Sequence, residues 1–101
     1  MEKRRPTYDL EAIKLSIGTP ETLAITTSAL QDALALGFDR TGIAETIIGI
    51  DSSMFFKSMT TFADHRVWQD VYHVSARGFQ LYVKFQANLV TEFGVMSFKE
   101  K

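Results

Sequence analysis

Three polar residues in the second half of the chain carry groups that could act on a phosphodiester. Gln69, Tyr82 and Lys99 each lie in a run where apolar and polar residues alternate, and successive side chains of a β-strand point to opposite faces of its sheet. If the three runs are neighbouring strands, the amide, the phenol and the ammonium share one face. With Lys57 and Lys84 nearby, this face could bind a phosphate, although an open sheet face is also ordinarily polar because water covers it.

The same alternation sorts the surrounding residues into an inward and an outward set. Asp70 is the exception, because its charge falls on the apolar side of its run, and we expect a bulge there. The inward residues are Trp68, Tyr72, Val74, Leu81, Val83, Phe85, Met96 and Phe98, and the outward residues are Gln69, Val71, His73, Gln80, Tyr82, Lys84, Gln86, Ser97 and Lys99.

Two carboxylates and two imidazoles between residues 64 and 73 invite a metal-site interpretation, which their spacing disfavours. Asp64, His65, Asp70 and His73 match no recognised pattern of metal ligands. The alternation also sends Asp70 and His73 to opposite faces. We therefore expect no metal, and we expect His65 to hold a turn together with Asp64. The absence of cysteine excludes a thiolate zinc site, a disulfide and a cysteine nucleophile.

Helices are predicted in the first half of the chain and strands in the second, which is the order of an α+β domain with helices packed on one face of a mainly antiparallel sheet. Apolar residues at helical spacing predict helices over 7–18, with Thr7 as the candidate cap, from Thr27 or Ser28 to 36, and over 40–48. Aromatic and β-branched residues predict strands near 55–61, 67–74, 79–87 and 93–99. The short connections between these strands favour antiparallel pairing of neighbours.

The composition is that of one globular domain, which we expect to span residues 1–101. A chain of 101 residues with 46% hydrophobic content can bury a single core. Its apolar runs are too short to cross a bilayer, no signal peptide is recognisable, and a cytoplasmic location is expected. The net charge of −1 and the pI near 6.1 provide no general attraction to nucleic acid, which argues mildly against an RNA substrate.

One long stretch nevertheless resembles the central block of the MqsR motility and quorum-sensing toxins. This stretch, residues 55–72, reads FFKSMTTFADHRVWQDVY. The first residues, MEKRRP, and the last, SFKEK, are also similar to the ends of that family, as is Ile47-Ile48-Gly49. The resemblance therefore covers essentially the whole chain.

The resemblance implies both a fold and an activity. The fold is RelE-like, and the activity is cleavage of single-stranded mRNA at short GC-containing sites by a metal-independent endoribonuclease through attack of the RNA's own 2′-hydroxyl. It further implies inhibition by an MqsA-like antitoxin protein, a role in stress and biofilm formation, and no cofactor. Neither membrane binding nor direct sequence-specific DNA binding is expected.

The resemblance also implies roles for individual residues, and three of these are the residues that the alternation places together. Each has a plainer interpretation, because a surface lysine is usually just solvated and a methionine more often fills a core gap. The aromatic and methionine positions could stack on an RNA base. The expected catalytic residues are Lys57, Gln69, Tyr82 and Lys99, and the expected substrate-binding residues are Phe56, Met59 and Lys84.

The chain departs from the family pattern at two positions, and one of them contributes to a second hypothesis. Phe56 stands where the best-known relatives have Tyr, and Thr7 stands where they have His. Phe56, together with the low pI, suggests an antitoxin-binding module whose RNA cleavage is weak or lost. A third hypothesis, an inert regulator that meets DNA only through its partner, has the least support, because no DNA-reading element is recognisable.

Overall fold

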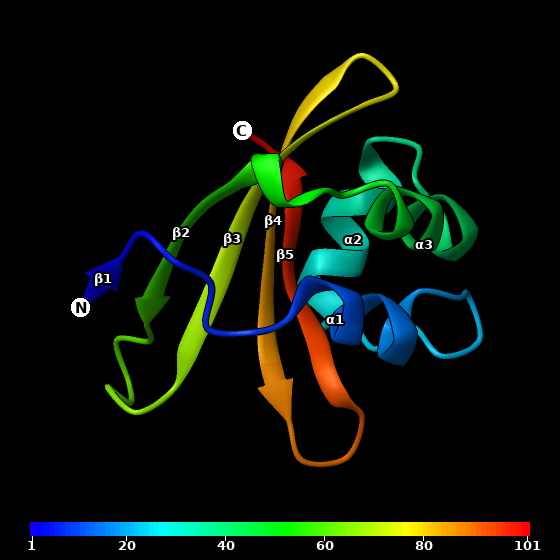
Figure 1. The fold of residues 1–101 in the computed structure, drawn as a ribbon. Helices are drawn as coiled ribbons and strands as arrows, with labels where there is room; N and C mark the ends of the chain where they lie inside the picture. The colour runs from blue at the N-terminus through cyan, green and yellow to red at the C-terminus, as the bar shows by residue number, and fades with distance from the viewer.

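The sheet is formed by five antiparallel strands that lie side by side in chain order (Figure 1). The computed structural model describes all residues from Met1 to Lys101. The four predicted strands are present, with bounds that differ from the expected ones by one or two residues. The strands are β1 (Glu2–Lys3), β2 (Phe55–Thr60), β3 (Trp68–Ala76), β4 (Phe79–Asn88) and β5 (Glu92–Glu100). β1 was not predicted, since two residues are too few to show alternation.

The helices are α1 (Leu10–Ile17), α2 (Thr27–Ala35) and α3 (Arg40–Ile48), followed by a short 3₁₀ turn at Ser52–Met54. Each begins after a residue whose side-chain oxygen accepts a backbone N–H of the first turn, and these caps are Asp9, Thr26 and Asp39. The bounds of α3 are as predicted. Thr7, Thr27 and Ser28 were the wrong choices of cap. None of the helices is long and apolar enough to cross a membrane.

All three helices lie on one side of the sheet, which confirms the α+β layering (Figure 1). The residues that are almost completely buried there, as the alternation predicted, include the inward residues of β4 together with Tyr72, Val74 and Phe98. Phe38, which follows α2, packs its ring edge-on against Phe98 with the ring centroids 5.1 Å apart. The other face of the sheet carries no helix, and it is the face on which the predicted site residues lie.

Asp70 is fully buried, but the bulge expected at this residue is absent. Asp70 pairs in register with Ser58 on β2 and Phe85 on β4. Its carboxylate instead accepts the backbone N–H groups of Thr7 and Tyr8, at 3.1 and 2.9 Å. These two bonds tie the N-terminal segment to β3 where the segment crosses the sheet (Figure 1). The buried Asp70 carboxylate therefore anchors β1 and the N-terminal segment that follows β1.

The bulges lie in β2 and β5. In β2 the register shifts between Phe55 and Lys57, and in β5 it shifts between the residues opposite Lys84 and Phe85. As a result Val95, opposite Phe85, enters the core, while Met96 is only half-buried. The prediction that Met96 faces inward was therefore wrong.

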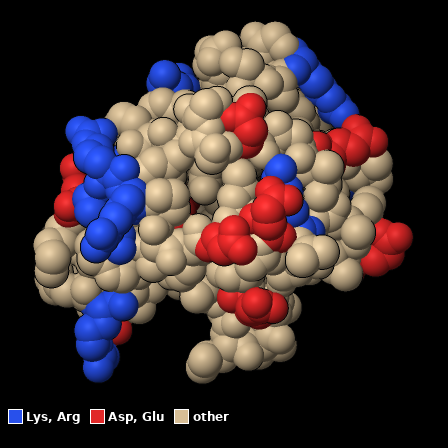
Figure 2. Space-filling view, in the orientation of Figure 1, with Lys and Arg blue, Asp and Glu red and all other residues tan.

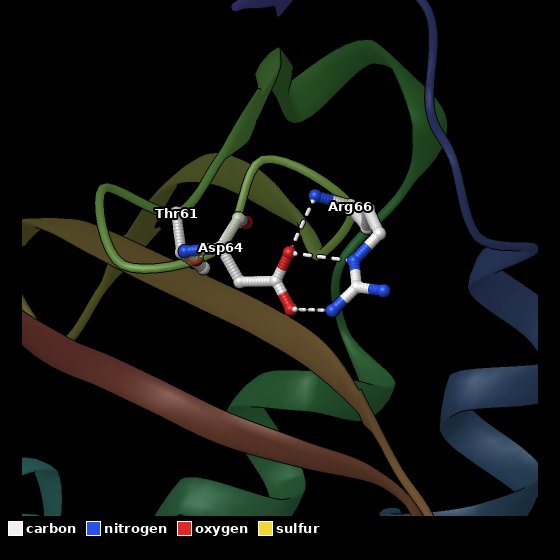
Figure 3. Close-up of polar contacts among 3 residues, drawn as sticks. All are labelled: Thr61, Asp64 and Arg66. Carbon is white, nitrogen blue, oxygen red and sulfur yellow. Dashed lines mark hydrogen bonds and ion pairs between the residues drawn. The ribbon is translucent and has the colours of Figure 1, made fainter.

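The loop between β2 and β3 is held by Asp64 and Arg66, whose side chains face each other in Figure 3. Arg66 donates from Nε and Nη2 to the two oxygens of the Asp64 carboxylate, at 3.1 and 3.2 Å. The Thr61 hydroxyl accepts the Asp64 N–H and donates to the Asp64 carbonyl. His65 is exposed and makes no hydrogen bond through its ring, so the prediction that it holds this turn was wrong.

Candidate active site

Cross-strand register arranges the outward side chains of the sheet in three rows. The first row runs from His73 on β3 through Tyr82 on β4 to Lys99 on β5, the second from Lys57 on β2 through Val71 and Lys84 to Ser97, and the third from Met59 through Gln69 to Gln86. Successive rows are two residues apart along each strand, or roughly 7 Å. All of the predicted site residues other than Phe56 occupy these rows. The shared face of Gln69, Tyr82 and Lys99 was predicted correctly, and the roles of all these residues remain predictions.

Phe56 joins the first row because of the bulge in β2. Its ring stacks on the imidazole of His73, with centroids 4.1 Å apart and planes 22° apart. The side chain is 37% exposed, so one part of the ring stays open to solvent. The Arg4 guanidinium lies 5.8 Å from the centroid of the same ring, and the Lys57 ammonium lies 5.4 Å from it. Strand alternation alone would not have paired Phe56 with Lys57 on one face.

Among the predicted catalytic residues, Tyr82 and Lys99 are the pair that lies directly opposite across two neighbouring strands. The Lys99 ammonium lies 5.7 Å from the centroid of the Tyr82 phenol ring. Burial raises the pKa of the Tyr82 phenol above its usual value of 10.0, the charge of Lys57 opposes this, and the charge of Glu2 adds to it. The phenol is therefore protonated at neutral pH, which suits it to donate a proton rather than to accept one.

Lys57 is paired with Glu2, a residue that the sequence analysis did not consider. The Lys57 ammonium donates to a carboxylate oxygen of Glu2 at 2.5 Å. This hydrogen bond, with the charge of Lys57, lowers the pKa of the Glu2 carboxyl. β1 brings Glu2 opposite Met59 and so onto the same face as Lys57. The pairing could not be foreseen because β1 was not predicted.

Gln69 lies on the expected face but apart from Tyr82 and Lys99. Its side-chain amide donates to the amide oxygen of Gln86 at 2.8 Å, and the residue is only 8% exposed. It is four residues from His73 along β3, which corresponds to about 13 Å. Gln69 therefore lies two rows from the Tyr82–Lys99 pair. Met59 is its half-buried neighbour on β2.

Lys84 lies in the middle row, between Val71 on β3 and Ser97 on β5. Burial lowers the pKa of its ammonium, and the charge of Lys99 lowers it further. A partly desolvated cation next to a second cation is stabilised by an anion placed between them. This geometry suits Lys84 to the predicted role of binding substrate.

His73 also lies on this face, but it was not among the residues predicted to act on RNA. The alternation set it on the outward face, yet only the register reveals that it lies directly opposite Tyr82. The centroids of the two rings are 6.2 Å apart. Asp70 and His73 lie on opposite faces, as predicted, since Asp70 pairs with Phe85. No group of three or more His, Asp or Glu side chains is arranged to hold a metal ion.

The charges of the chain are segregated between its two layers, although its net charge is only −1. Residues 7–53, which contain the helices, include seven acidic and two basic residues, a net charge of −5. The remaining residues, which supply the sheet, include five acidic and nine basic residues, a net charge of +4. In Figure 2 the acidic side chains lie mainly over the helical part of the view, and Lys and Arg gather at the left, over β1 and β2. The low pI is therefore a property of the helical layer.

Two comparisons with known proteins identify the family of the chain. The family profile described as "motility quorum-sensing regulator, toxin of MqsA" matches residues 5–100. The mRNA interferase toxin MqsR of Escherichia coli (strain K12) is 41% identical over 101 residues, an alignment that covers all of both chains. A match of this length and identity settles the family, and the chain belongs to the MqsR toxin family.

Proposed function

We propose that this protein is the toxin of a toxin–antitoxin pair and that it cleaves single-stranded mRNA in the cytoplasm without a metal ion. The observation that carries the proposal is the Tyr82–Lys99 pair, with Lys57 beside it, on an open sheet face in a member of the MqsR family. Neither of the two hollows in the surface includes a residue of the three rows. The substrate therefore lies across an open face, which suits a flexible single strand with splayed bases.

The chemistry uses the RNA's own 2′-hydroxyl as the nucleophile. Its oxygen bonds to the adjacent phosphorus as the bond from phosphorus to the 5′-oxygen breaks, leaving a 2′,3′-cyclic phosphate and a 5′-hydroxyl. Lys57 and Lys99 stabilise the negative charge that builds on the phosphorane. Tyr82, which is protonated at neutral pH, donates its proton to the departing 5′-oxygen. This assignment leaves the proton of the 2′-hydroxyl without an acceptor.

The other predicted residues are proposed to hold the RNA on either side of the reacting phosphate. Phe56, stacked on His73 with part of its ring exposed, offers a surface on which a base can stack. Gln69 and Met59, two rows away, contact a neighbouring nucleotide rather than the scissile phosphate. We propose short GC-containing sites as the preferred sequence and an MqsA-like antitoxin as the protein partner, on the family relationship alone.

The main alternative is an antitoxin-binding module with weak or lost cleavage. It was motivated by the low pI and by Phe56. The segregation of charge weakens the first reason, because the sheet layer is basic while the whole chain is not. The stacking of Phe56 on His73 weakens the second, because this contact needs an aromatic ring but no hydroxyl.

Cleavage of a single-stranded, GC-containing RNA in the presence of EDTA separates the two functions. We expect cleavage by the unmodified protein, and a loss of about 10²- to 10³-fold in rate for Lys99→Ala, which removes one charge that stabilises the phosphorane. Lys14→Ala is the matched control, since Lys14 lies on α1, on the covered side of the sheet, and should cleave at the normal rate. No cleavage by the unmodified protein, or equal rates for both variants, would support the binding module.

The Glu2 carboxylate competes with RNA phosphate for Lys57, so Glu2→Gln should tighten RNA binding. Removing one negative charge from the face, and freeing an ammonium, is expected to raise affinity by roughly two- to fivefold. The effect should shrink as salt increases, because counterions screen an exposed ion pair. Binding of a 2′-deoxy analogue, which cannot be cleaved by this chemistry, measures it. Unchanged affinity at low salt would mean that RNA does not meet Lys57.

A further inference from the structure

His73 has the position and the free lone pair that the proposed reaction still lacks. It lies between Phe56 and Tyr82 in the first row, half-buried. No hydrogen bond within the chain engages either of its ring nitrogens, so both remain available to a ligand. The Phe56 ring, stacked on the imidazole with the two planes 22° apart, holds the plane of the imidazole. A histidine held in this way beside a phenol and two ammonium groups is an unusual occupant of a merely solvated sheet face.

We propose that His73 is the general base that takes the proton from the attacking 2′-hydroxyl of the RNA. This inference rests on the proposed function, and it assigns the one role that Lys57, Tyr82 and Lys99 leave open. As the 2′-oxygen bonds to phosphorus, its proton moves to His73, and the proton of Tyr82 moves to the 5′-oxygen that departs. The imidazolium then gives its proton, through water, to the phenolate, so that both groups return to their neutral starting forms.

The charges around His73 favour its neutral form, which is the form a base requires. Burial lowers the pKa of the imidazole below its usual value of 6.5, and the positive charges of Lys101 and Lys57 lower it further. Glu2, the acidic group that β1 brings onto this face, is paired with Lys57. The titratable and charged groups that face His73 are Lys57 from β2, Tyr82 and Lys84 from β4, Lys99 and Lys101 from the end of β5, and Glu2 and Arg4 from the N-terminal segment.

The two titrations predict the shape of the pH–rate profile. The rate should rise with pH as His73 loses its proton, at a pKa below 6.5, while Tyr82, whose pKa lies above 10.0, keeps its proton through neutral pH. The pKa of the Glu2 carboxyl lies below 4.5, so a rise in rate above that pH does not come from Glu2. The His73→Gln variant then decides whether this acidic limb belongs to His73.

The test is the single-turnover rate of RNA cleavage between pH 5 and 9, in EDTA, for the full chain and its variants. His73→Gln, which keeps a polar side chain but cannot take a proton, should cleave about 10²- to 10⁴-fold more slowly at pH 7.5 and should lose the acidic limb. His65→Gln is the matched control, because His65 is exposed in the β2–β3 loop, and it should behave as the unmodified protein. Thermal unfolding of each variant verifies that it is folded.

A second variant separates proton transfer from a structural role. His73→Ala opens space beside Phe56, and added imidazole should restore part of its rate, with a pH dependence set by the added base. The inference is overturned if His73→Gln keeps the normal rate, if its residual activity keeps the acidic limb, or if imidazole restores nothing to a folded His73→Ala. A failure of the unmodified protein to cleave RNA would instead refute the proposed function, so the two failures are distinguishable.

Discussion

Replacing Tyr82 with Phe should slow RNA cleavage by about 10²- to 10⁴-fold, the range typical of a lost general acid. The substitution removes only the hydroxyl, and it leaves the ring in its place opposite His73 and Lys99. Binding of RNA should change little, because the loss concerns a proton that moves only as the 5′-oxygen departs. The rate of a single turnover at saturating enzyme measures the effect directly.

Tyr8→Phe is the matched control for Tyr82→Phe. The Tyr8 hydroxyl donates to the backbone carbonyl of Trp68 at 2.6 Å, and its ring packs against Phe93, so it belongs to the core side of the sheet. Removing this hydroxyl should cost some stability and leave the cleavage rate unchanged below the unfolding temperature. If both variants cleaved RNA at the normal rate, Tyr82 would not be the acid.

Replacing Asp70 with Ala should lower the free energy of unfolding by about 3 kcal/mol, because two hydrogen bonds to a charged acceptor are lost at once. Asp70 is fully buried, and the N–H groups of Thr7 and Tyr8 lose the acceptor that fixes the N-terminal segment to β3. For a domain whose total stability is about 5–15 kcal/mol, this is a large fraction. Denaturant unfolding followed by circular dichroism measures it.

Asp64→Ala provides the comparison for Asp70→Ala. Asp64 also accepts a backbone N–H, that of Arg66, and it carries an ion pair as well. Its setting is the solvent-accessible β2–β3 loop, where water replaces lost partners, so its substitution should cost much less stability. Equal losses for the two variants would show that the Asp70 carboxylate is not the buried anchor that its contacts indicate.

The alternation of polar and apolar residues was enough to predict the sheet layer and its open face. The side chains of β4 face in the predicted directions, and the bounds of α3 agree, because long runs with clear periodicity specify their own geometry. Tyr82 and Lys99 were placed together by the same argument, and their register in β4 and β5 confirms it.

The errors arose where tertiary contacts override the local pattern. A bulge in β2 turns Phe56 toward the outward face, and a bulge in β5 takes Met96 out of the core. Asp70 can occupy a buried position of a regular strand only because a distant segment supplies hydrogen bonds to its carboxylate. One of the donors, the backbone N–H of Tyr8, lies 62 residues earlier in the chain. Glu2 reaches Lys57 through a two-residue strand. Such pairings depend on register and on chain crossings that no single run of residues encodes.

The pI of the whole chain likewise failed to predict the charge of the sheet layer. The pI suggested a protein with little attraction to RNA, because it averages an acidic helical layer with a basic sheet layer. Electrostatic attraction acts over about 8 Å at physiological salt, so the phosphates of a bound strand respond mainly to the sheet layer. The sign of the electrostatic potential at the site is therefore decided by where the charged residues lie in the fold, and not by the net charge of the chain.

The most direct test of the central claim uses an RNA in which one 2′-hydroxyl, next to the mapped cleavage site, is replaced by hydrogen. In EDTA, the unmodified RNA should be cut to a 2′,3′-cyclic phosphate and a 5′-hydroxyl, and the substituted RNA should resist cleavage at that bond while still binding. Cleavage of the substituted RNA at the same bond, or loss of cleavage of the unmodified RNA when EDTA is added, would contradict a metal-independent reaction through the 2′-hydroxyl.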